Sequence, residues 1–125
     1  MTRTLTLSPL GHTWLIDLDG TVLRHNGYLT GDDGLLPGVE AFWAQIPAGD
    51  VIIILSARED VDRDGSLQVL RRHGLRFDHV IFGLPFGERV VINDTKPSGL
   101  ITALAVAVTR DEGLEGMRVD VDDAL

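Results

Sequence analysis

Two acidic residues close an apolar run near the start of the chain. Asp17 and Asp19 end the run 14–19 and are followed at once by Gly20 and Thr21. Residues i and i+2 of a strand lie on the same side, so we expect both carboxylates on one side at the carboxyl end of a buried strand. Two such acids repel each other and lose hydration, which requires a compensating cation or proton. The spacing therefore predicts a metal site.

Length and composition limit the classes of protein. The 125 residues suffice for one domain, 1–125, with 1–11 as an N-terminal extension and 115–125 as an acidic, solvated and partly mobile tail. The absence of cysteine excludes disulfides and thiolate metal sites, and the first residues lack the apolar core of a signal peptide, so we predict a cytoplasmic protein. The net charge of −8 argues against nucleic acid and anionic membrane as partners, but is compatible with a small phosphorylated substrate.

Apolar runs alternate with segments of helical period, which predicts an α/β fold with a parallel sheet covered by helices. The expected strands are 12–18, 50–55, 79–82, 89–92 and 104–108. A helix is expected after Pro37, where the apolar residues follow a 3.6-residue period: Val39, Phe42, Trp43 and Ile46. A second helix is expected to end in basic residues before a left-handed Gly74.

Polar residues follow several of these strands, where ligands gather in an open parallel sheet. Besides the two acids of the first strand, they are Ser56, Arg58, Asn93, Asp94 and Lys96. Phosphoryl transfer through an aspartyl-phosphate needs such a set: a carboxylate nucleophile, a second carboxylate for proton transfer, a cation, and donors to the phosphoryl oxygens.

Three segments resemble signatures of the haloacid dehalogenase superfamily of phosphohydrolases. They are Asp17-Leu18-Asp19-Gly20-Thr21, Leu55-Ser56-Ala57-Arg58 and Val90-Val91-Ile92-Asn93-Asp94. The segments 25–29, 82–85, 92–97 and 109–113 resemble small members associated with capsule and polysaccharide biosynthesis. The resemblance covers about residues 12–114 and implies a Rossmann-like three-layer sandwich with a central parallel sheet.

The resemblance also implies roles for individual residues. Asp17 would attack phosphorus, and Asp19 would protonate the leaving group and then deprotonate the attacking water. Mg²⁺ would be held by Asp17, the backbone carbonyl of Asp19 and Asp94, because this metal favours oxygen ligands and few carboxylates. Ser56 would donate to a phosphoryl oxygen. The alternatives are that the Ser56 hydroxyl, at the end of a strand, caps the next helix, and that Asp94 is a turn residue. Thr21 would hold the turn through its hydroxyl.

The sequence departs from the superfamily pattern at two places. Many relatives have a phosphate-binding lysine where this chain has Leu84, and Lys96, the only lysine against ten arginines, is the candidate replacement, unless it is a solvated loop lysine. Asn93 replaces the first acid of a paired Asp-Asp. It is expected to contact the residues that hold the metal rather than the metal itself. Arg58 is a second candidate for phosphate binding, but it could equally pair with a neighbouring surface acid.

The segment 21–37 has room only for a short hairpin flap, which predicts a capless enzyme. An open site either accepts a large substrate or borrows walls from a neighbouring subunit, so we hypothesise a homo-oligomer with its interface near the flap. Four residues of the flap offer hydrogen bonds suited to a sugar: Arg24, His25, Asn26 and Tyr28.

The favoured function is a Mg²⁺-dependent phosphomonoesterase acting on a sugar phosphate or related metabolite of polysaccharide biosynthesis. Phosphotransfer to another acceptor uses the same intermediate and stays an alternative. A non-catalytic phosphate-binding or scaffold protein is favoured only by Leu84, while retention of Asp17 and Asp19 argues against it. A signalling receiver domain is disfavoured, because a later strand ends in Ser56-Ala57 where it needs a phosphorylated aspartate.

Overall fold

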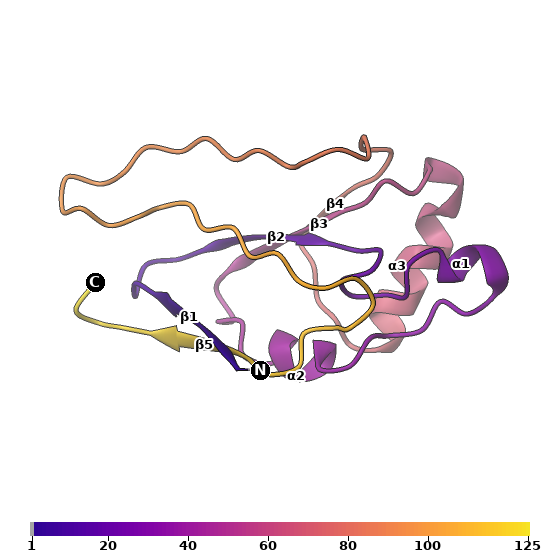
Figure 1. The fold of residues 1–125 in the computed structure, drawn as a ribbon, viewed down its shortest axis with the longest axis horizontal. Coiled ribbons are helices and arrows are strands. Elements are labelled where there is room, and N and C mark those ends of the chain that lie inside the picture. Colours follow the sequence, from indigo (N-terminus) through magenta and orange to yellow (C-terminus); the bar gives the residue numbers. More distant parts are fainter. Residues whose placement is uncertain (1) are drawn as a thin grey trace.

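The computed structural model describes residues 2–125, which form parallel strands and short helices (Figure 1). The elements in chain order are β1 (Arg3–Leu7), β2 (Thr13–Asp17), α1 (Gly27–Thr30), α2 (Val39–Trp43), β3 (Val51–Leu55), the 3₁₀ turn η1 (Asp60–Asp62), α3 (Arg63–Arg72), β4 (His79–Ile81) and β5 (Met117–Val121). The expected strands 12–18, 50–55 and 79–82 are confirmed as β2, β3 and β4. The arrangement is α/β and compatible with a Rossmann-like layout.

Strands β2, β3 and β4 form a parallel sheet in that order, with Asp17 beside Leu55 and Leu55 beside Ile81. One face of the sheet is covered by α2 and α3, whose apolar residues share a core with Ile16, Ile52 and Ile54. The other face is open, since Leu15 is 48% exposed and Ile81 45%. Alternation along β2 puts the side chain of Asp17 on this open face.

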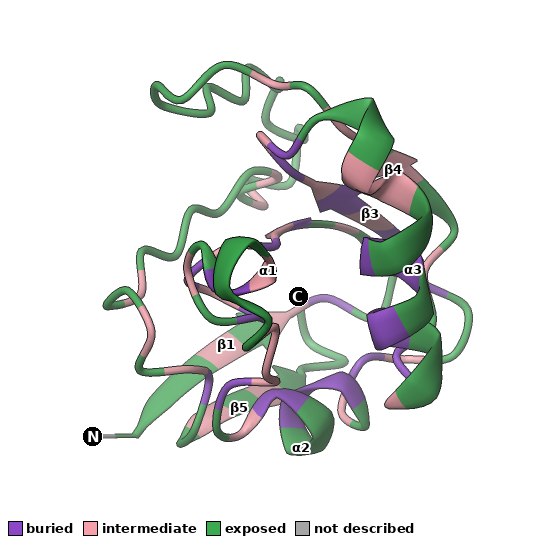
Figure 2. Cartoon of the chain, turned by 90° about the vertical axis from the view of Figure 1, so that its right-hand side faces the viewer, coloured by how far each residue is buried: buried purple, intermediate pink, exposed green. Residues whose placement is uncertain are grey.

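The expected strands 89–92 and 104–108 are not formed, which corrects the sequence analysis. Residues 82–116 lie within the described part of the chain and contain no helix or strand. Residues 84–110 run out from the sheet and back as an extended excursion (Figure 1), and most of it is exposed (Figure 2). Val90 and Ile92 are 80% and 93% exposed, because their apolar run has no neighbouring strand to pair with. Because residues 82–116 also contain no helix, the second helical layer of the expected three-layer sandwich is not formed within the described residues.

The two ends of the chain pair with each other, which also differs from expectation. Strands β1 and β5 form a separate parallel sheet in which Leu5 lies beside Val119. Residues 3–7 of the expected N-terminal extension thus form a strand, and the acidic tail contains a strand because Val119 and Val121 alternate with charged residues. Gln45, just after α2, holds β5 in place by accepting the Val119 N–H at 2.9 Å and donating to the Met117 carbonyl at 2.8 Å.

Other local expectations agree with the structure. The helix after Pro37 is α2, and the second helix is α3, which ends with Arg71 and Arg72 before Gly74 at φ +70°. The flap 21–37 has a hairpin-like base, where Leu23 bridges Leu35, and carries α1 at its tip. None of the helices in residues 2–125 has the length and apolar character needed to cross a membrane.

Asp50 anchors the start of the sheet. This buried carboxylate accepts hydrogen bonds from the His12 backbone N–H at 3.1 Å and the Trp14 indole N–H at 2.9 Å, and its Oδ2 lies 2.7 Å from His12 Nδ1. Burial alone would raise the pKa of Asp50, but the hydrogen bonds from Trp14 and His12 hold it below its ordinary value of 3.8. The folded state therefore favours the ionised carboxylate.

We expect Asp50→Asn to lower the free energy of unfolding by about 1–3 kcal/mol near pH 7, because the new amide group faces two donors. A carboxyl group with a lowered folded-state pKa stabilises the fold above its unfolded-state pKa, and this contribution is lost as the pH falls through the folded-state pKa. The gap between native and variant should therefore shrink below about pH 4. Urea unfolding from pH 7 to pH 3 measures it; a gap that is constant with pH would contradict this assignment.

Candidate active site

The site begins with the tight turn after β2. The Leu18 N–H still bonds to the Leu55 carbonyl at 3.1 Å, but the Leu18 carbonyl accepts the N–H groups of Val22 and Leu23, both at 3.0 Å. Gly20 has φ +80°, a conformation that favours glycine, and a Cβ there would lie 3.0 Å from the Arg110 side chain. The turn therefore leaves the end of β2 uncovered by a side chain at position 20.

Asp17 is the last residue of β2, and its carboxylate is held between two donors. The Thr21 hydroxyl donates to Asp17 Oδ2 at 3.0 Å, and Arg89 Nη1 donates to Asp17 Oδ1 at 3.0 Å. The side chain of Asp17 is 37% exposed, so a small molecule can approach it. Thr21 fixes the orientation of the carboxylate, and Arg89, from the excursion, balances its charge.

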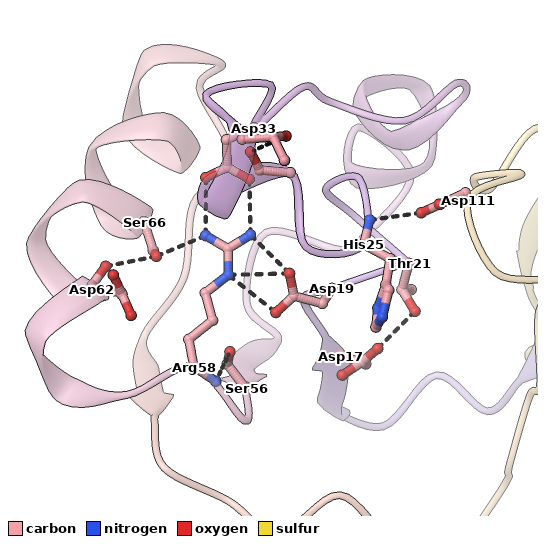
Figure 3. Close-up of polar contacts among 12 residues, drawn as sticks. Asp17, Asp19, Thr21, His25, Asp33, Ser56, Arg58, Asp62, Ser66 and Asp111 are labelled. Carbon is pink, nitrogen blue, oxygen red and sulfur yellow. Dashed lines mark hydrogen bonds and ion pairs between the residues drawn. The ribbon is translucent and has the colours of Figure 1, made fainter.

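Asp19 faces a different cation. Arg58, just after β3, lies between the carboxylates of Asp19 and Asp33, and we call these three residues the Arg58 clamp (Figure 3). Arg58 Nε donates to both oxygens of Asp19 at 3.1 and 3.0 Å, and Nη2 donates to Asp19 Oδ1 at 2.9 Å. On the other side, Nη1 and Nη2 donate to the two oxygens of Asp33 at 2.9 and 2.8 Å.

The remaining surroundings of Arg58 complete its burial. Its Nη1 also donates to the Ser66 hydroxyl at 2.9 Å, and its guanidinium carbon lies 4.1 Å from the centre of the Tyr28 ring. Arg58 is 1% exposed. Burial alone would lower the pKa of Arg58, but the hydrogen bonds and charges of Asp33 and Asp19 raise it above its ordinary value. Arg58 is therefore a permanently charged, fully engaged buried group.

Two arginines, Arg58 and Arg89, supply the positive charge that the paired acids were expected to need. Figure 3 shows the carboxylates of Asp17 and Asp19 turned toward different partners, and Asp94 lies on the exposed excursion. The described residues contain no group of three or more acidic or histidine side chains that could hold a metal ion. This arrangement does not fit the expected Mg²⁺ site, so no chemical step below is assigned to a metal.

The predicted phosphate-binding residues are placed differently from one another. Ser56 is buried after β3, and its hydroxyl accepts a hydrogen bond from the backbone N–H of Arg58 at 3.0 Å. Ser56 therefore holds the local turn rather than capping α3. All N–H groups of the Arg58 guanidinium point to the acids of the clamp or to Ser66, not to surface acids. Lys96 lies on the excursion. In the described part of the chain, the cation paired with Asp17 is Arg89 and not Lys96.

The expected metal-site residues of the excursion contact its return limb. Asn93 Nδ2 donates to the Thr102 hydroxyl at 2.9 Å, and that hydroxyl donates to the Asp94 backbone carbonyl. Both residues are exposed. The structure therefore does not bring Asn93 and Asp94 together with the acids of β2 as a metal centre.

Only part of the flap set gathers near the clamp. Tyr28 lies against Arg58, and burial, followed by the charge of Asp19, raises the pKa of its phenol. A cavity of about 320 Å³ adjoins it, lined by Tyr28, Gly31, Asp33, Val61, Asp62, Gly65 and Ser66. Arg24 forms an exposed pair with Asp32 at 3.1 Å, Asn26 has φ 56° before α1, and the His25 backbone N–H bonds to Asp111 at 2.7 Å.

Three contributors were missed from the sequence. Asp33, Ser66 and Arg89 were not among the expected site residues, and they reach the site from the flap, α3 and the excursion. The period of α3 gave the one available signal, since Ser66 precedes the buried apolar residues Val69 and Leu70 by three and four positions and so lies on their side of the helix.

Comparison with known proteins gives no family assignment, because no protein-family model, no curated protein and no solved structure matches this chain.

Proposed function

We propose that this protein is a phosphomonoesterase that transfers the phosphoryl group of a small ester, such as a sugar phosphate, first to Asp17 and then to water. The observation that carries the proposal is the accessible Asp17 carboxylate, which lies at the carboxyl end of a parallel strand beside a guanidinium. The resemblance of three segments to signatures of haloacid dehalogenase phosphohydrolases supports the same chemistry, and the parallel sheet is compatible with it. A phosphotransferase differs only in the final acceptor.

The proposed reaction has two steps. Asp19 first takes up a proton from solvent. An oxygen of Asp17 then forms a bond to phosphorus while the ester P–O bond breaks, and the leaving oxygen takes that proton from the Asp19 carboxyl group. Asp19 then accepts a proton from water, whose oxygen attacks phosphorus and releases phosphate and the Asp17 carboxylate. Asp19 Oδ2 accepts one N–H from Arg58 and keeps a second lone pair, so it can still exchange a proton.

We assign the phosphate-binding cation to Arg89 in preference to Lys96. Arg89 Nη1 lies 3.0 Å from Asp17 Oδ1, so a phosphoryl group approaching Asp17 comes within reach of the other N–H groups of the guanidinium. A planar guanidinium can bind two phosphate oxygens at once. Charge on the developing transition state would then be balanced at the nucleophile itself.

Arg89→Ala is expected to lower kcat/KM for an aryl phosphate about 10- to 100-fold, the effect of losing one charge-assisted hydrogen bond. Lys96→Ala should change it less than about twofold. Steady-state phosphate release by the two variants, purified in parallel, makes the comparison. The opposite ranking would return the role to Lys96.

The experiment that tests the function is phosphate release from a panel of sugar phosphates and a generic aryl phosphate. It is run with Mg²⁺ and with chelator, on the native chain and on Asp17→Asn. Release that requires Asp17 supports the proposal and ranks the substrates, and the chelator arm decides the metal requirement separately. No release from any ester by the folded protein would overturn it.

A non-catalytic phosphate-binding protein is the second candidate. The observation that favours it is the occupation of both Asp19 oxygens by Arg58, which ties the expected proton donor to a structural network. NMR chemical shifts can locate bound inorganic phosphate. Binding near Asp17 and Arg89 by a protein that shows no turnover would favour this second function.

A further inference from the structure

Asp33 and Asp19 hold opposite sides of one guanidinium. Asp33 engages Nη1 and Nη2 through its two oxygens, and Asp19 engages Nε and Nη2. Both carboxylates are 17% exposed and Arg58 is 1% exposed, so these contacts are made largely away from water. A two-pronged contact at each side fixes the plane of the guanidinium as well as its position.

The other neighbours of Arg58 cannot fix that plane alone. Ser66 takes one N–H through a hydroxyl that in turn donates to the Asp62 carbonyl at 2.7 Å, and Tyr28 offers the face of its ring. Without the carboxylate of Asp33, the outer edge of the guanidinium would keep a single neutral acceptor. It could then turn about its own side chain, and the atoms that hold Asp19 would turn with it.

Asp33 therefore controls the orientation of a group that it does not touch. We propose that Asp33 is a positioning residue that acts through Arg58 to aim the Asp19 carboxylate, an inference that rests on the phosphomonoesterase proposed above. Asp33 lies in the flap, so it also ties the position of the flap to the proton-transfer residue. Its substitution should lower the rate of the chemical step while substrate binding is kept.

Asp33→Asn tests this, with Asp32→Asn as the matched control. Asp32 is the neighbouring acid, but its side chain is 66% exposed and pairs with Arg24 at the surface. We expect Asp33→Asn to lower kcat about tenfold with KM unchanged. The Arg58 Nε–H, followed by NMR, should exchange with water about tenfold faster as its bond to Asp19 loosens. Asp32→Asn should change neither quantity. Asp33→Glu, which keeps the charge, should recover part of kcat and guards against a misfolded amide variant.

The outcomes separate the two proposals. If the native chain shows turnover that depends on Asp17, and Asp33→Asn and Asp33→Glu leave kcat and the Arg58 exchange rate unchanged, the role of Asp33 is overturned and the enzyme stands. If kcat falls equally in Asp32→Asn, the effect belongs to the flap and the role of Asp33 is again overturned. If the native chain releases no phosphate, the enzyme fails at that first measurement and this inference fails with it.

Discussion

Asp17→Asn is expected to reduce phosphate release by a factor on the order of 10³ or more, because an amide cannot serve as the nucleophile that forms the aspartyl-phosphate. Folding should change little, since the Asp17 side chain is 37% exposed and an asparagine oxygen can still accept from Thr21 or Arg89. A rapid acid quench with labelled substrate should find protein-bound phosphate in the native chain and none in the variant. Thermal unfolding confirms that the variant is folded.

The same experiment needs protection against a contaminating phosphatase. Asp64→Asn, an exposed position in the first turn of α3, passes through the same purification and is expected to keep native turnover. Asp19→Asn should slow both half-reactions. A folded Asp17→Asn protein that retains more than about a tenth of native turnover would rule out nucleophilic attack by this carboxylate.

The sheet that carries Asp17 could be predicted because its strands are short, continuous apolar runs. Val51–Leu55 is the clearest case, and its neighbours in the sheet follow from the same signal. The run 89–92 has the same character but forms no strand, because an apolar composition does not provide a neighbouring backbone to pair with. Strand formation there depends on tertiary context that local sequence does not contain.

At the two ends of the chain, strands form where none was expected. Glu115, Asp120 and Asp122 gave the last segment the appearance of an acidic, solvated tail, yet Arg118 and Asp120 alternate with valines in the manner of a half-buried strand. Parallel pairing with Arg3–Leu7 joins residues more than 100 positions apart, such as Arg3 and Met117. The prediction gave more weight to the number of charged residues than to their two-residue period. It also missed the partner strand, which lies at the other end of the sequence.

In the candidate site, too, local features could be predicted and contacts between distant residues could not. The acids at the end of β2 and the need for a positive charge beside them could be predicted, because desolvated carboxylates require compensation wherever they lie. Arg58 could be placed among the polar residues that follow the strands, but its contact with Asp19 and the approach of Arg89 to Asp17 could not be predicted. These contacts depend on the pairing of β2 with β3 and on the path of the excursion. Asp33 could not be predicted for the same reason.

Arg58→Met is expected to lower the free energy of unfolding by about 3–5 kcal/mol, the largest effect on stability among the changes considered. The methionine fills much of the same space, but Asp19 and Asp33 are then left facing each other with no cation between them. Chemical denaturation measures the loss. Arg63→Met removes an arginine from an exposed pair with Asp60, 3.9 Å apart, and should cost less than about 1 kcal/mol.

A double-variant cycle separates loss of the ion pair from loss of packing. If the cost of Arg58→Met comes from two uncompensated carboxylates, neutralising one of them should relieve part of it, so Arg58→Met combined with Asp33→Asn should be more stable than the sum of the single changes predicts. The expected coupling is about 1–2 kcal/mol in this direction. Strictly additive losses would mean that the buried arginine stabilises the fold by filling space, and that the charge of Asp33 is balanced elsewhere.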